Sequence, residues 1–280
     1  MKKIVSVFLA LIMIFSMFAV GTMAAGKYRY VVLGDSIAYG SGLLNASEAC
    51  YGKAVADTCG FDYKNYSVPG ATTHDLIYRL NESTVRSGVE RADIISISIG
   101  GNDFLDKLGN LMYNAIVKKD YKDYDRLAFG VYSNISNAID DIREINDDAV
   151  VLLQTLYNPQ FDYLKEAYQQ GADRINDTIY RCAEENSGVV VVDVASALNG
   201  DESNFADDTM HPSAKGNEKI AYEVLKTLRR LGYTNKISLD AYTKGIDVVL
   251  GPGVYGALNY FAYFFKVIAR MQSAIALIMR

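Results

Sequence analysis

Five short apolar runs recur along the chain, and segments with helical spacing separate them. Four of the runs are rich in valine and isoleucine and show little alternation, which is typical of parallel strands covered on both faces. The pattern predicts an α/β fold, a three-layer sandwich with a five-stranded parallel sheet and right-handed crossovers. The expected strands cover 28–33, 63–68, 93–99, 149–155 and 188–194, and the clearest helices cover 72–80, 121–145, 161–185 and 213–231.

The stretch 104–120 does not fit a simple crossover between strands. Its apolar residues fall at helical spacing, and it directly follows the third expected strand. Because ligands of open α/β sheets bind at the carboxyl ends of the strands, the stretch is a candidate wall of a binding pocket. A helix that only packs on the core is the alternative.

Both ends of the chain depart from the strand–helix pattern. Lys2 and Lys3 precede a long apolar run, and small residues follow it at 21–25, the order of a secretory signal peptide. An uncleaved membrane anchor is the alternative, although the run is at the short limit for a span. We expect a signal peptide at 1–25 and a secreted folded domain over 26–236. A C-terminal extension should then cover 237–280.

The extension contains a strongly apolar segment, 254–279. Its polar residues lie at steps of three and four and would share one narrow helix face, whereas the rest of the circumference is apolar. Such a helix suits a membrane surface or a partner protein, and docking on the chain's own core is the alternative. A full span is disfavoured, because two cations would lie near its middle. The polar residues are Asn259, Tyr263, Lys266, Arg270 and Ser273.

Composition excludes several classes of protein. The formal net charge is −5 and no long basic run occurs, so we expect no nucleic-acid partner. The three cysteines and two histidines are not spaced as metal ligands, so we expect no metal. Export would permit a disulfide, and the short separation of Cys50 and Cys59 makes a bridge between them plausible, in which case Cys182 would be left over and buried. The sequence does not decide whether the bridge forms.

Polar turn residues follow the first three expected strands. Ser36 ends the sequence Gly34-Asp35-Ser36 after the first strand, where a sharp turn would present it as a nucleophile. Gly70 follows the second strand, and Asn102 lies in the Gly-Gly-Asn-Asp sequence after the third. The N–H groups of Ser36 and Gly70 and the Asn102 amide could together form an oxyanion hole.

A base for Ser36 is found far along the chain, in the sequence Asp208-Thr209-Met210-His211-Pro212. Proline suits the first position of a helix, and a turn before it would let the Asp208 carboxylate reach the His211 ring. The carboxylate would fix one tautomer, and His211 could then take the Ser36 proton. The other histidine, His74, begins an expected helix and should be a solvated surface residue.

Two further acids lie near the nucleophile. Asp35 directly precedes Ser36, and Asp103 follows Asn102. Both occupy turn positions, where hydrogen bonding to the backbone explains an aspartate better than acid catalysis.

These segments resemble, in order, the four sequence blocks of the SGNH, or GDSL, hydrolase superfamily. The matching residues are Gly34-Asp35-Ser36, Gly70, the sequence from Gly100 to Asp103, and the sequence from Asp208 to His211. The resemblance spans 28–231 and implies a flavodoxin-like SGNH hydrolase domain without a metal or organic cofactor. It also implies ester hydrolysis through an acyl-enzyme, with catalytic Ser36, Asp208 and His211. The oxyanion hole would be formed by Ser36, Gly70 and Asn102.

The sequence does not identify the ester that the protein would hydrolyse. The apolar stretch after Asn102 and the apolar tail favour a lipase-like esterase that acts on acyl lipids or short acyl esters. Export and the 21 tyrosines are compatible with a carbohydrate O-deacetylase that acts on polysaccharide. A non-catalytic envelope-binding protein on the same fold is a third hypothesis, which the complete set of catalytic residues disfavours.

Overall fold

The computed structural model describes residues 27–161, 164–239 and 245–248. The expected signal peptide at 1–25 and the apolar segment 254–279 lie outside the described residues, so both stay predictions. In the part of the chain that is described, no helix is long and apolar enough to cross a membrane.

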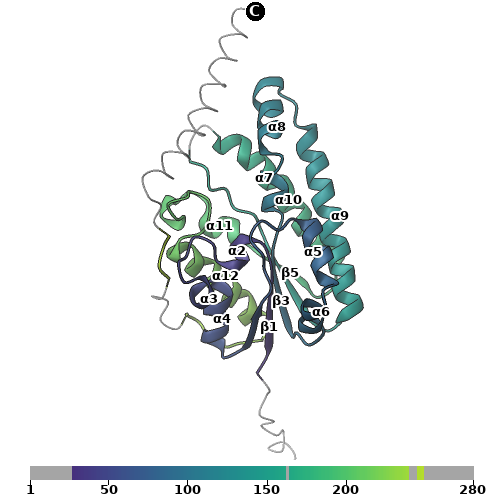
Figure 1. Cartoon of the computed structure of the whole chain (residues 1–280), viewed down its shortest axis with the longest axis vertical. Coiled ribbons are helices and arrows are strands. Elements are labelled where there is room, and N and C mark those ends of the chain that lie inside the picture. The colour runs from purple at the N-terminus through teal and green to yellow at the C-terminus, as the bar shows by residue number, and fades with distance from the viewer. Residues whose placement is uncertain (1–26, 162–163, 240–244, 249–280) are drawn as a thin grey trace, which may run out of the picture.

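A five-stranded parallel sheet forms the centre of the domain and confirms the predicted fold class (Figure 1). Its order is β2-β1-β3-β4-β5, so the chain moves outward to β2 and then returns to the other side of β1. The reversal leaves a crevice between the carboxyl ends of β1 and β3, where open sheets of this kind bind ligands. The strands are β1 (Arg29–Gly34), β2 (Asp62–Asn65), β3 (Ile94–Ser98), β4 (Val150–Gln154) and β5 (Val189–Val192).

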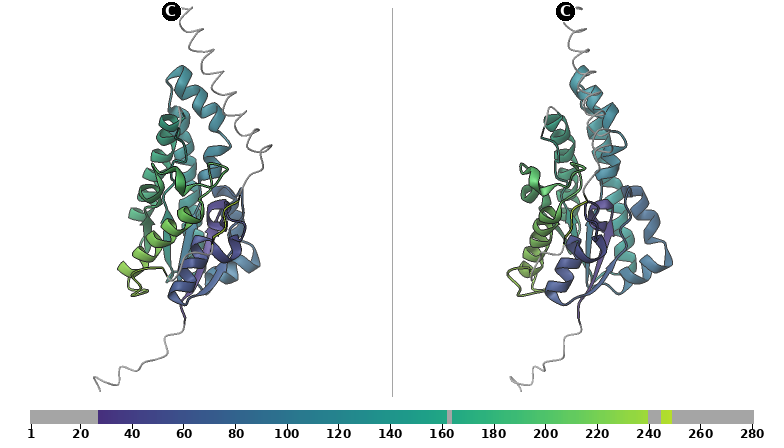
Figure 2. Two further views of the ribbon diagram at one scale, coloured as in Figure 1. Left: turned by 90° about the vertical axis from the view of Figure 1, so that its left-hand side faces the viewer. Right: turned by 60° about the vertical axis from the view of Figure 1, so that its left-hand side comes forward.

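Helices cover both faces of the sheet (Figures 1 and 2). One face carries α5 (Thr73–Leu80), α6 (Ser83–Glu90), α9 (Lys122–Ile145) and α10 (Lys165–Glu185). The other face carries α4 (Tyr51–Cys59), α11 (Val194–Leu198) and α12 (Ala214–Arg230). Successive residues of β1 enter opposite cores: Val31 packs in the first and Val32 in the second. Burial on both faces is therefore why the strands are continuous apolar runs.

Among the elements predicted from the sequence, two ends differ from the expected bounds by more than two residues. The helix expected from 161 begins only at Lys165, and β2 ends at Asn65 rather than at 68. Beyond β2 the chain still follows β1, because Tyr66 N–H donates to the Val32 carbonyl at 2.8 Å and Val68 N–H donates to the Gly34 carbonyl at 2.9 Å. Between these two bonds, the Asn65 side chain accepts the Ser67 N–H at 2.9 Å.

The stretch 104–120 combines the two roles expected of it. It contains the end of α7 (Gly101–Leu105), α8 (Leu108–Tyr113) and a five-residue π-helix, η1 (Asn114–Lys118). Phe104 is buried in the core, with its ring centroid 4.7 Å from that of Tyr168. Leu105 instead faces the cavity described below. The stretch therefore packs mainly on the core and contributes one side chain to the cavity wall.

Cys50 and Cys59 do not form the disulfide that the sequence left open. Cys50 caps the start of α4 and Cys59 is its last residue. A rise of about 1.5 Å per residue separates the two ends by roughly 13 Å. Disulfide-bonded Cα atoms lie only about 4.4–6.8 Å apart. Cys50 Sγ lies 3.3 Å from Tyr63 Oη, and Cys182 is buried as expected.

The close approach of β1 and β3 at Gly34 gives a test of the fold. Gly34 has φ of +132°, and a Cβ there would lie 2.0 Å from the Ser98 carbonyl oxygen. We expect Gly34→Ala to lower the free energy of unfolding by at least about 2 kcal/mol, measured by urea denaturation, because strain and a backbone clash add.

Gly60→Ala is the matched control. Gly60 has φ of +73° but no atom within 4 Å of a Cβ. Gly60→Ala should therefore lower the free energy of unfolding by about 1 kcal/mol, from conformational strain alone. Equal losses in the two variants would contradict the tight contact between β1 and β3.

Candidate active site

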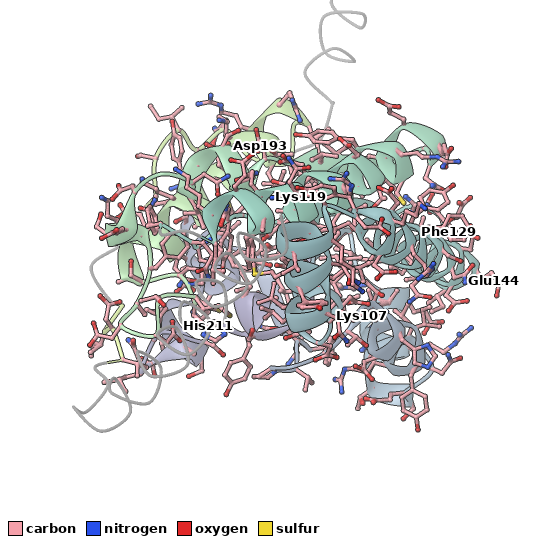
Figure 3. The ribbon with its side chains drawn as sticks, turned by 90° about the horizontal axis from the view of Figure 1, so that it is seen from above. Lys107, Lys119, Phe129, Glu144, Asp193 and His211 are labelled. Carbon is pink, nitrogen blue, oxygen red and sulfur yellow. The ribbon has the colours of Figure 1, made fainter. Side chains whose placement is uncertain are left out.

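A cavity of about 260 Å³ opens at the carboxyl ends of β1 and β3. Ser36, Gly70, Asn102 and His211 all line it, although they come from four separate segments. Figure 3 looks onto this end of the molecule and shows His211 on the side away from Phe129 and Glu144 of α9. The structure thus brings together the predicted site residues, with Asp208 behind His211.

The nucleophile position is set by the end of β1. Asp35 N–H donates to the Ser98 carbonyl at 3.1 Å, and the Asp35 carboxylate caps α2 (Ser36–Tyr39) by accepting the Ile37 N–H at 2.9 Å. These two bonds fix the turn between strand and helix on either side of Ser36. Ser36 is therefore the first residue of α2 and faces the cavity.

His211 lies in a turn that its own partner organises. Asp208 Oδ1 accepts the N–H groups of Met210 and His211, each at 2.9 Å. Thr209 between them adopts φ of +58°, a left-handed conformation that costs a β-branched residue energy. Tyr157 Oη donates to the Met210 carbonyl at 2.8 Å and holds the turn from the core side.

The three polar side chains form one hydrogen-bonded series. Asp208 Oδ2 lies 2.6 Å from His211 Nδ1, and His211 Nε2 lies 3.0 Å from Ser36 Oγ. With Asp208 ionised, Nδ1 carries the proton and donates to the carboxylate, so Nε2 is free to accept the Ser36 proton. This tautomer is the one that a general base requires.

Asp208 stays ionised in spite of partial burial. Burial alone would raise its pKa, but hydrogen bonds from the His211 ring and from the N–H groups of His211 and Met210 outweigh it. The pKa of Asp208 is therefore held below its ordinary value. A negative charge is thus present beside His211 whenever an imidazolium forms.

Donors for an oxyanion surround the same cavity. Asn102 Nδ2 donates to the Ala71 carbonyl at 2.8 Å, which orients the amide and leaves its second N–H available. Among the described residues, no hydrogen bond uses the N–H of Gly70 or of Ser36. The three predicted donors thus have capacity for a further acceptor in the cavity.

The other polar residues near the site have structural roles, as expected. Asp103 accepts the Thr73 N–H at 2.9 Å and the Thr73 hydroxyl at 2.6 Å, and so links α7 to the start of α5. His74 is exposed on α5. In the described residues, no group of three or more histidine, cysteine, aspartate or glutamate side chains could hold a metal ion.

Sequence reasoning missed the residues that shape the cavity. Gln154, Thr155 and Leu156 come at the end of β4, and Val194 follows β5. The rule that located Ser36 and Asn102, which looks just beyond the carboxyl end of each strand, would have found them as well. The apolar and aromatic lining residues are Ile37, Pro69, Ile99, Leu105, Leu156, Tyr157, Tyr168, Val194 and Met210.

Comparison with known proteins agrees with the geometry. The model of the GDSL-like lipase/acylhydrolase family matches residues 32–219, more than half of the chain. The chain belongs to the GDSL-like lipase/acylhydrolase family. The match ends within α12, so the family segment does not include the C-terminal extension.

One sequence relative and two solved structures are similar to this chain. The spore germination lipase LipC of Bacillus licheniformis is 28% identical over 174 residues, which are 60% of this chain and 76% of LipC. A lipase from a goat rumen metagenome shares the fold, with a TM-score of 0.61 and 24% identity over 75% of this chain and 99% of its own. An acetylxylan esterase from Geobacillus stearothermophilus gives a TM-score of 0.57 and 18% identity over 77% of this chain and 98% of its own.

Asp35, the residue before the nucleophile, should make the stability of the folded domain depend on pH. The side chain is only 2% exposed, and burial raises its pKa to about 7. Between about pH 4 and pH 7 the folded chain holds this proton and the unfolded chain releases it, so the folded state loses stability as the pH rises.

Asp35→Asn keeps the acceptor for Ile37 N–H and removes the titration. From pH 5 to pH 8, wild type should lose on the order of 2 kcal/mol of unfolding free energy relative to Asp35→Asn, measured by urea denaturation. A difference between the two proteins that does not change with pH would show that Asp35 does not titrate in this window.

Proposed function

We propose that the chain is a serine esterase that hydrolyses carboxylic esters through an acyl-enzyme on Ser36. The observation that carries the proposal is the series from Asp208 through His211 to Ser36, which ends in a cavity lined by oxyanion donors. Membership of the GDSL-like lipase/acylhydrolase family supports the same chemistry.

The geometry suggests how the chain's residues would share the reaction. Ser36 Oγ attacks the ester carbonyl carbon while His211 Nε2 takes its proton, and Asp208 stabilises the imidazolium. The N–H groups of Ser36, Gly70 and Asn102 bind the oxyanion of the tetrahedral intermediate. His211 then protonates the leaving alcohol, and a water molecule repeats the sequence on the acyl-enzyme to release the acid.

For the substrate we propose esters with short or medium acyl chains. The apolar residues around Ser36 suit an acyl group, and the cavity of about 260 Å³ is small for a long chain. The similarity to a lipase at 28% identity favours acyl esters. A carbohydrate O-deacetylase is the second candidate, because Ser41, Gln154 and Thr155 give the cavity polar groups that could face a sugar.

A series of p-nitrophenyl esters from acetyl to palmitoyl tests the reaction and the acyl group together. We expect turnover to be highest with short or medium chains. In Ser36→Ala it should fall at least about 10⁴-fold, because removal of the nucleophile leaves only binding and the oxyanion hole. Turnover by folded Ser36→Ala close to wild type would overturn the assignment. Activity on acetyl esters alone, with acetate released from an acetylated polysaccharide, would favour the second candidate.

Asn102→Ala tests the oxyanion hole separately. The variant keeps nucleophile and base, so it should be milder than Ser36→Ala. We expect a loss of about 10²–10³ in kcat, the range found when one such donor is removed. The thermal unfolding midpoint should be followed in parallel, because Asn102 also bonds to Ala71. An unchanged kcat would exclude Asn102 as an oxyanion donor.

A further inference from the structure

Residues 245–248, which we call the strap, lie against the catalytic end of the domain although they follow the matched family segment. The strap runs antiparallel to the loop 40–45, which leaves the nucleophile helix α2, through a bridge between Asp247 and Leu43. Leu44 N–H donates to the Ile246 carbonyl at 2.7 Å, and Val248 N–H donates to the Gly42 carbonyl at 2.8 Å.

A side-chain contact adds to this pairing. Ile246 N–H donates to Asn45 Oδ1 at 3.0 Å. The strap therefore holds the loop 40–45 through three hydrogen bonds that involve its main chain. The same loop contains Ser41, which lines the cavity, and begins directly after α2.

The loop in turn lies close against the histidine turn. A Cβ on Gly42 would lie 2.6 Å from the Pro212 carbonyl oxygen and 3.1 Å from the His211 Cβ. Gly42 thus occupies the space directly beside His211. The loop 40–45 therefore forms a wall against the backbone of the histidine turn.

The strap also bonds directly to the helix that follows His211. Asp247 Oδ1 accepts the Ala214 N–H at 2.6 Å, and Ala214 is the first residue of α12. This N–H is one that the helix itself cannot satisfy. One four-residue segment therefore ties the loop after Ser36 to the helix after His211.

We propose that the strap positions His211 against Ser36 and that Asp247 is the positioning residue that fastens it to α12. The inference rests on the proposed esterase function, because its purpose is the alignment of nucleophile and base. Ser36 and His211 are 175 positions apart in the sequence, and the strap joins the loop after the first to the helix after the second. Tyr157 and Asp208 hold the histidine turn from the inner side.

Asp247→Ala in the full chain tests the proposal. The hydrogen bond between Asp247 and Ala214 is exposed, so removal of the carboxylate leaves the Ala214 N–H within reach of water. We expect kcat to fall by about tenfold to a hundredfold with KM within about twofold, because a shift of the base misaligns the proton transfer. Asp247→Asn retains an oxygen acceptor for Ala214 N–H and should recover kcat to within about threefold of wild type.

Asp201→Ala is the matched control. The Asp201 carboxylate also binds the first turn of α12, through Lys215 at 2.8 Å. Among the described residues its other side-chain partners are Ser203 and Lys219, and none of the three belongs to the loop 40–45. It should change stability without changing kcat beyond about twofold. A kcat of Asp247→Ala equal to wild type, or equal losses in Asp247→Ala and Asp201→Ala, would overturn the positioning role.

Imidazole NMR spectra test the strap without any substrate. The chain has two histidines, so exposed His74 serves as an internal reference. In Asp247→Ala the His211 ring signals should shift or broaden, whereas those of His74 should not, and Asp201→Ala should leave both unchanged. Unaltered His211 signals in Asp247→Ala would contradict the proposal. If wild type hydrolyses no ester, the proposed function fails, and these spectra still decide the role of the strap.

Discussion

The hydrogen bond between Ser36 Oγ and His211 Nε2, at 3.0 Å, joins residues that are 175 positions apart in the chain. The parallel sheet brings the two segments that carry these atoms to one edge. Parallel strands with a reversal at β1 bring the ends of β1, β2 and β3 to one edge, and the turn that precedes α12 places His211 at the same edge. The bond is therefore a property of the whole sheet and cannot form in any isolated segment.

Two carboxylates within this site illustrate how surroundings decide the role of a residue. Asp35 is almost fully buried, and loss of water raises its pKa towards neutrality. Asp208 is only partly buried and accepts hydrogen bonds from the turn and the ring of His211, which hold its pKa low. Asp208 can thus support an imidazolium, whereas Asp35 acts as a helix cap whose charge is costly.

Much of this arrangement could be predicted because its signals are local. Burial on both faces gave β1, β3, β4 and β5 their apolar runs, and polar residues after the strands marked Ser36, Gly70 and Asn102. The helix α4 was not predicted, although Tyr51, Val55 and Thr58 share its buried face. Its small residues and Gly52 weakened the pattern.

The position of the strap and the separation of Cys50 from Cys59 could not be predicted from the local sequence pattern. The strap is held by main-chain hydrogen bonds and one carboxylate, and its Ile246 is exposed, so no periodic pattern marks it. Closeness in sequence suggested a bridge between Cys50 and Cys59, yet the helix between them keeps them at opposite ends. Long-range hydrogen bonds decide where the strap lies, and helix geometry decides that the two cysteines stay apart.

Mass spectrometry of the protein, stopped in acid during turnover of an activated ester, tests the central claim most directly. We expect one acyl group, attached to the peptide that contains Ser36, and none in Ser36→Ala. We also expect His211→Ala to reduce the rate at which the adduct forms. An acyl group on a different residue would contradict the assignment of Ser36 as the nucleophile. If burst kinetics show that a covalent intermediate accumulates, a Ser36 peptide without an acyl group would contradict it as well.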